Sequence, residues 1–116
     1  MKNVGILTNV VFANLDQEML FRTEEAERGC SKAQHRLGSL LMQRKNDLKA
    51  LHEAYKWLFI SVVLGNESAK DDLTEVNKIL GEDEIDPGFE LATEWLTEKF
   101  DDWHSPKPVD TFHSAV

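Results

Sequence analysis

The histidines and the cysteine are the side chains of this chain best suited to metal binding or nucleophilic catalysis. No pair of histidines has the spacing of a zinc motif such as His-Glu-x-x-His; they stand at His35, His52, His104 and His113. Cys30 is the sole cysteine, and the sequence places no base beside it to activate a thiol. We therefore predict no metal site, no cofactor and no catalytic residue, with His35 and His52 on helix surfaces.

Acidic side chains form a second chemical pattern, in the last third of the chain. Glu90, Glu94 and Glu98 recur every four residues, and Asp101 and Asp102 extend the row. The row fits a solvated outer face of a helix, a docking strip for a basic partner, or paired carboxylates for acid–base chemistry. An exposed helix face supplies no burial to tune a carboxylate as a base, which disfavours the third interpretation.

Charge is unevenly distributed along the chain. The net charge is -8, and residues 81–102 hold nine acidic side chains against one basic side chain, Lys99. Residues 28–56 hold seven basic side chains and two acidic ones, with no interleaved aromatic residues beyond predicted core positions. The acidic end would repel phosphates and attract a basic protein, more weakly as salt rises. We therefore expect a basic protein partner and no nucleic acid.

The composition disfavours a membrane protein and a disulfide scaffold. No run approaches the ~20 apolar residues that a membrane span requires, and a single cysteine cannot form an intrachain disulfide. Thr8 and Asn9 interrupt the apolar stretch near the start, which disfavours a signal peptide. We therefore expect no membrane association and a cytoplasmic location.

An internal repeat indicates the elements that position these residues. At an offset of 36 residues the aligned pairs are Gly29 with Gly65, Ala33 with Ala69, Leu37 with Leu73, and Phe21 with Trp57. The segment AYKWL at 54–58 also recurs as ATEWL at 92–96. In both units, apolar residues at helical spacing precede a glycine that can end the helix, and an alanine then lets the next helix pack closely. The pattern predicts repeated helical hairpins.

The same periodicity predicts an all-α chain of five or six helices, near residues 4–13, 15–28, 31–45, 48–64, 67–80 and 87–101. Pro87 suits the first turn of the last helix, with Asp86 as its N-cap. Residues 1–102 then form one repeat domain. Residues 103–116 contain two prolines and no periodicity, so we expect a C-terminal tail.

Two stretches resemble a known repeat. AQHRLGSLL and EAYKWLFISVVLGNESA are similar to the Sel-one-like repeat, a relative of the tetratricopeptide repeat with two antiparallel helices per unit. The matching residues are Ala33, Leu37 and Gly38 in the first helix and Ala54, Trp57, Gly65 and Ala69 in and after the second. Departures are Glu53 at a lysine position, Val62 and Val63 at an alanine pair, and residues 44–46 in place of a G-x-G turn. The best-matched repeat covers about residues 33–69.

The resemblance implies an α/α superhelix, or solenoid, of about two and a half antiparallel helix hairpins with a non-catalytic protein-binding function. Such a domain would cap or occlude one partner, and members of the family include immunity proteins that neutralise a cognate bacterial toxin. The alternatives are an adaptor or scaffold subunit of a larger regulatory assembly and a small hydrolytic enzyme. We expect a structural core of Phe21, Gly29, Ala33, Leu37, Gly38, Ala54, Trp57, Gly65, Ala69, Leu73, Ala92 and Trp95. We expect partner contacts from Glu90, Glu94, Glu98, Asp101, Asp102, His35, Ser39 and Gln43.

Overall fold

The computed structural model describes residues 17–104, and this part of the chain contains helices and no strand. A helix over residues 17–27 comes first. It is followed by α2 (Ser31–Met42), α3 (Leu48–Val63), the short 3-10 helix η1 (Glu67–Ala69), α4 (Lys70–Leu80) and α5 (Glu82–His104). The predicted all-α class is confirmed for these residues, whereas the helix predicted at 4–13 lies outside them.

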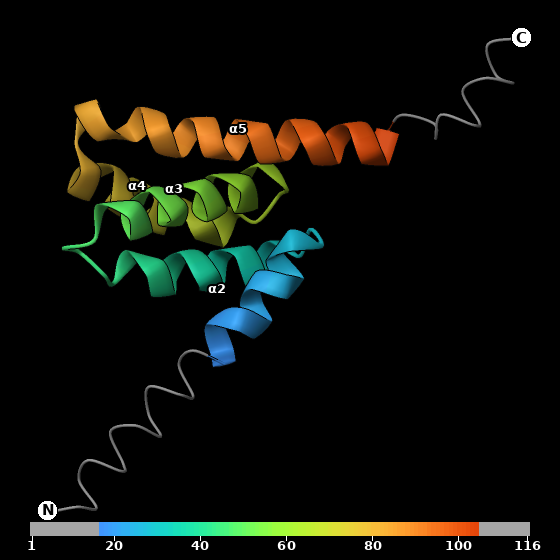
Figure 1. Ribbon diagram of the computed structural model, residues 1–116, viewed down its shortest axis with the longest axis horizontal. Helices are drawn as coiled ribbons and strands as arrows, with labels where there is room; N and C mark the ends of the chain where they lie inside the picture. Colours follow the sequence, from blue (N-terminus) through green and yellow to red (C-terminus); the bar gives the residue numbers. More distant parts are fainter. Residues whose placement is uncertain (1–16, 105–116) are drawn as a thin grey trace, which may run out of the picture.

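Helix α3 is the central element. It contacts α2, α4 and α5, and Figure 1 shows α2 and α5 on opposite sides of it. Its sequence explains this position, because apolar residues surround most of the helix and such a helix must be covered on several sides. The buried residues of α3 are Ala50, Leu51, Ala54, Tyr55, Trp57, Leu58, Ile60 and Ser61.

Two glycines end helices as the repeat predicts. Gly29 and Gly65 have φ angles of 99° and 103°, a conformation that side chains disfavour. After each glycine, the next backbone N–H donates to a carbonyl five residues back: Cys30 to Glu25 at 3.2 Å, and Asn66 to Ser61 at 2.9 Å. Both are Schellman turns, so the same helix ending recurs 36 residues apart.

Trp57 lies in the hydrophobic core between helices, as predicted. Its side chain is 2% exposed, and its ring meets that of Trp95 edge to face, with centroids 5.7 Å apart. The same cluster contains Ala26, Ala33, Leu37, Ile60 and Ala92. A second cluster lies on the other side of α3 and includes Leu51, Ala54, Tyr55, Leu58, Ala69, Val76 and Leu80. Of the predicted core residues, Ala33, Leu37, Gly38, Ala54, Trp57, Ala69, Ala92 and Trp95 are buried, and Gly29 and Leu73 are half-buried. The prediction that Gly65 is a core residue is wrong, because Gly65 is exposed in the turn that ends α3.

The prediction that Phe21 is a core residue is wrong, because its side chain is 53% exposed. Met19 and Ala26 face the core from the helix over residues 17–27. Phe21 follows Met19 by two positions, which is about 200° around a helix. Phe21 therefore lies on the outer side of its helix. The repeat aligns it with Trp57 in the sequence, but Phe21 is exposed and Trp57 is buried.

Two glycines allow close contacts between helices. A Cβ on Gly38 of α2 would stand 2.6 Å from Leu58 Cγ and 3.3 Å from the carbonyl oxygen of Ala54. A Cβ on Gly88 of α5 would stand 2.9 Å from the Cβ of Tyr55. The distances of 2.6 Å and 2.9 Å are shorter than packed side chains tolerate, so α2 and α5 each approach α3 at a residue without a side chain.

The start of the last helix differs from the prediction. Helix α5 begins at Glu82, and Pro87 lies inside it instead of in its first turn, so Asp86 is not its N-cap. Acidic side chains favour a helix N-terminus, and here Glu82, Asp83 and Glu84 form the first turn. Pro87 lacks the N–H that would bond the carbonyl of Asp83, but both residues are exposed, so water can satisfy that carbonyl.

Other helix ends differ by a few residues. Helix α2 ends at Met42, three residues before the predicted end, and a turn precedes α3. The Asp47 side chain caps α3 by accepting a hydrogen bond from the Ala50 N–H at 3.1 Å. Helix α5 runs through His104, two residues into the predicted tail.

Candidate protein-binding surface

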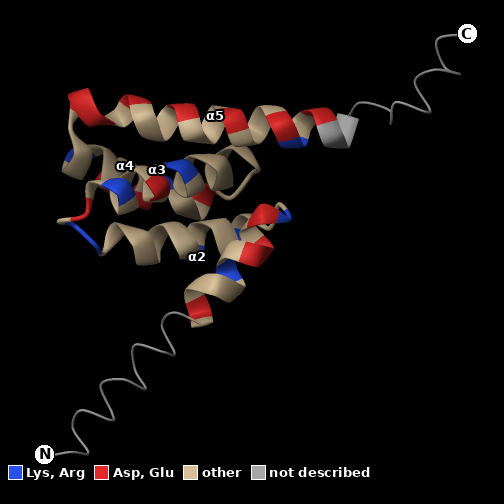
Figure 2. Ribbon diagram, in the orientation of Figure 1, with Lys and Arg blue, Asp and Glu red and all other residues tan. Residues whose placement is uncertain are grey.

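The acidic side chains predicted to bind a partner lie on one exposed face of α5. Figure 2 shows acidic residues recurring along this helix. Glu90, Glu94, Glu98 and Asp101 are all exposed, and we call these four residues the acidic row. Asp102 belongs to α5 by its backbone, but its side chain lies outside the part of the structure described. Helical spacing places the acidic row away from the buried residues Ala92 and Trp95.

Trp95 sets the rotation of α5 and so orients the acidic row. Its indole Nε1 donates to Glu27 Oε1 at 2.8 Å, which ties α5 to the end of the helix over residues 17–27. The Nζ of Lys99 lies 5.7 Å from the Trp95 ring centroid. This basic side chain is therefore drawn toward the core side of α5 and away from the acidic row.

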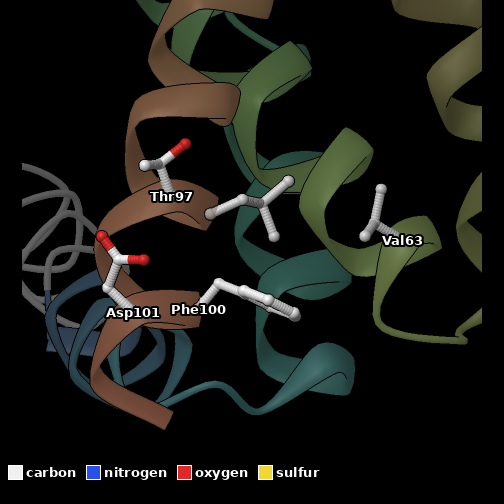
Figure 3. A pocket seen from close by; sticks show the side chains of 5 residues that line it. Val63, Thr97, Phe100 and Asp101 are labelled. Atoms are coloured by element: carbon white, nitrogen blue, oxygen red, sulfur yellow. The ribbon is translucent and has the colours of Figure 1, made fainter. Parts of the chain in front are cut away.

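An apolar groove lies beside the acidic row, between the end of α3 and the last turns of α5. Its described lining is Val63, Leu96, Thr97, Phe100 and Asp101. Figure 3 shows Phe100 extending from α5 toward α3, which carries Val63. Sequence reasoning missed this groove, since Val63 and Phe100 come together only through the packing of α5 on α3.

A second hollow adjoins the groove on α5. Its described lining is Thr93, Glu94, Thr97 and Glu98, so Thr97 belongs to both. The Thr93 hydroxyl donates to the carbonyl of Glu90 at 3.1 Å. A small polar strip of threonines thus separates apolar side chains from carboxylates on one exposed helix.

The other three predicted contact residues belong to α2 or its end and lie apart from the acidic row. His35 Nε2 lies 2.9 Å from Asp72 Oδ2, and the Ser39 hydroxyl donates to the same oxygen at 2.7 Å. These two side chains therefore link α2 to α4. Gln43 is exposed and caps the end of α2. The structure does not bring this group together with the acidic row, because α2 and α5 lie on opposite sides of α3 (Figure 1).

The histidines predicted for helix surfaces are both partly buried between helices. The side chain of His52 is 15% exposed, and its Nε2 lies 3.3 Å from Glu84 Oε1, which joins α3 to α5. His35 makes the corresponding link from α2 to α4. Each imidazole pairs with a carboxylate of another helix, so these side chains serve helix packing.

Asp72 gives the fold a dependence on pH that can be measured. Partial burial raises the pKa of Asp72, but hydrogen bonds from Ser39 and His35 outweigh it and hold the pKa below the ordinary value of 3.8. A lowered pKa means that ionised Asp72 stabilises the fold above this value, and that the contribution is lost as pH falls through the folded-state pKa.

We expect Asp72→Asn to lower the free energy of unfolding at neutral pH. We also expect the free energy of unfolding of this variant to decrease less than that of the unsubstituted protein as the pH is lowered to about 2. Urea unfolding followed by circular dichroism across this range measures both effects. The exposed neighbour Asp71 supplies the control, as Asp71→Asn should follow the unsubstituted protein. If the free energy of unfolding fell equally steeply with pH for Asp72→Asn and for the unsubstituted protein, ionised Asp72 would not stabilise the fold.

Other candidate chemistry in residues 17–104 is sparse. Cys30 is exposed and stands at the N-cap of α2, as its place after Gly29 predicts. Among the side chains that the structure describes, those of residues 17–101, no three histidine, cysteine or acidic groups gather closely enough to hold a metal ion. None of the helices described is both long enough and apolar enough to cross a membrane.

Comparisons with protein-family models, with curated proteins and with solved structures gave no match to this chain. The resemblance of residues 33–69 to the Sel-one-like repeat therefore stays a prediction from the residues quoted above.

Proposed function

We propose that this chain is a non-catalytic protein-binding module that binds one basic protein through the acidic row of α5. The observation that supports this proposal is the exposure of four carboxylates on one helix face, beside an apolar groove. A charged surface next to an apolar one is the arrangement of a protein interface, where apolar contacts are surrounded by a polar rim.

The spacing of the acidic row favours a partner of opposite charge. Glu90, Glu94 and Glu98 are neighbours at four-residue spacing, and like charges at this spacing repel by a few tenths of a kcal/mol per pair. A basic partner would relieve this repulsion and would be steered toward the face before contact. Because Trp95 already fixes the rotation of α5, little ordering of the backbone would oppose binding.

The architecture and the partner class are further parts of this proposal. We infer an α/α solenoid of repeated hairpins, supported by the matching Schellman turns at Gly29 and Gly65. Occlusion of a toxin or effector is the mechanism that the family resemblance implies, so the protein would act as an immunity protein.

An adaptor is the second candidate function. Leu20 and Phe21 are exposed on the helix over residues 17–27. Figure 1 shows the start of this helix on the side of α2 away from α5. Exposed apolar side chains on a second part of the surface favour a second partner. An adaptor would bind two proteins at once, whereas an immunity protein would recover only one dominant partner in affinity capture.

Neutralising two members of the acidic row should weaken the partner complex. We expect Glu94→Gln with Glu98→Gln to raise Kd by about two- to thirty-fold, since each exposed charge pair contributes roughly 0.2–1 kcal/mol. Affinity capture followed by mass spectrometry would identify the partner, and fluorescence anisotropy would measure Kd.

The matched control changes the same number of charges on another helix. Asp71 and Glu75 are exposed on α4, also four residues apart, so Asp71→Asn with Glu75→Gln changes the net charge equally. The proposal requires this control to bind like the unsubstituted protein. Equal weakening by both double variants would show that only net charge matters, and recovery of no partner under gentle conditions would count against a binding function.

A further inference from the structure

The groove between α3 and α5 combines exposed apolar side chains with an acidic margin. Val63 is 52% exposed at the last residue of α3, Phe100 is exposed, and Leu96 is partly buried between them and the core. Asp101 and Thr97 form the outer margin, as Figure 3 shows. Large apolar side chains gathered at a hollow are typical of a contact site.

The order of side chains around α5 places charges next to this groove. At about 100° per residue, Leu96 and Phe100 occupy the flank toward α3, and Thr93 and Thr97 come next around the helix. The acidic row follows beyond the threonines. From Glu90 to Asp101 it extends roughly 17 Å along the helix axis, which is about the length of a three-turn partner helix.

We propose that the groove binds an amphipathic basic helix of the partner protein, with an apolar side chain against Val63, Leu96 and Phe100 and lysine or arginine side chains on the acidic row. This inference rests on the function proposed above and specifies the partner's chemistry. Charge complementarity selects this occupant, because the carboxylates of the margin repel nucleic acids and anionic lipid surfaces. Helix-in-groove recognition supplies the geometry, as it uses apolar anchors on one helix face and charges on the flanks.

A charge-adding substitution in the groove separates apolar contact from electrostatic attraction. Val63→Asp removes an apolar contact and adds a negative charge. If the basic helix packs in the groove, this variant should bind it more weakly. If electrostatic attraction alone holds the helix, the variant should bind it equally well or more tightly. The probe is a synthetic helical peptide with leucines on one face and lysines on the other, measured by fluorescence anisotropy. We expect Kd to rise at least about fivefold, the effect of losing one substantial interface contact.

The matched control is Leu48→Asp, at the other end of α3. Leu48 is 48% exposed, close to the exposure of Val63, and does not line the groove. We expect this variant to bind the peptide no more weakly than the unsubstituted protein. Circular dichroism should show both variants folded, because each side chain is largely outside the core.

The outcomes distinguish this inference from the function it rests on. If Val63→Asp binds equally or more tightly while Glu94→Gln with Glu98→Gln binds weakly, the groove inference is overturned and the acidic row stands. If no variant changes the Kd of the peptide, both proposals fall. The groove inference would also be overturned if peptide-free protein showed nuclear Overhauser contacts from the Val63 methyls to residues 105–116 or to a second copy of the chain. The groove would then have another occupant.

Discussion

Replacing Trp57 by alanine is expected to lower the free energy of unfolding by about 3–5 kcal/mol, the range for a fully buried tryptophan. Trp57 is nearly inaccessible and packs with residues of α2, α3 and α5 in one cluster. Its ring also contacts Trp95 edge to face, and the Nζ of Lys56 lies 4.3 Å from its centroid. Truncation would leave a cavity at the point where three helices meet.

Phe21→Ala provides the contrasting substitution. The repeat aligns Phe21 with Trp57, but the structure exposes Phe21, so its truncation should cost less than about 1 kcal/mol. Guanidinium unfolding followed by far-ultraviolet circular dichroism measures both variants without relying on tryptophan emission. If Phe21→Ala lowered the free energy of unfolding as much as Trp57→Ala, the placement of Phe21 at the surface and of Trp57 in the core would be wrong. If Trp57→Ala does not fold, Trp57→Phe keeps the comparison measurable.

The second large effect is expected where α2 meets α3. Leu58→Ala should cost about 2–5 kcal/mol, because Leu58 is fully buried in the second cluster. Gly38→Ala should also destabilise the fold, by up to about 2 kcal/mol, because overpacking costs about 1–3 kcal/mol and the better helix propensity of alanine offsets about 1 kcal/mol of this cost. The new methyl would stand 2.6 Å from Leu58 Cγ, and buried Leu58 has little room to move.

A double-mutant cycle tests this contact directly. Leu58→Ala removes the atoms that the Gly38→Ala methyl would meet, so the double variant should be more stable than the sum of the single effects predicts, by about 0.5–3 kcal/mol. Urea unfolding of the four proteins measures the coupling. Additive effects would mean that Gly38 does not pack against Leu58.

Helix class and helix ends were readable from the sequence where local chemistry decides them. Gly29 and Gly65 end helices because their backbone conformation excludes most side chains. The start of α5 was not readable in the same way. Pro87 is typical of a first turn, but three acidic residues before it favour a helix N-terminus strongly enough to include the proline.

The candidate site was predictable only in part, and for a related reason. The spacing of the acidic row already implies one helix face, since four-residue intervals are a local property. The groove depends on Val63 of α3 meeting Phe100 of α5, and the pairing of His35 with Asp72 likewise spans two helices. Distances along a helix predict neither, because both depend on how the helices pack.

Salt dependence of partner binding tests the central claim most directly. The Kd of the captured partner would be measured over a series of salt concentrations for the unsubstituted protein, for Glu94→Gln with Glu98→Gln, and for Asp71→Asn with Glu75→Gln. The acidic row predicts a Kd that rises with salt, a shallower rise for the α5 variant, and no change in slope for the α4 control. The same slope for the α5 variant and the unsubstituted protein would contradict the claim that α5 carries the binding surface.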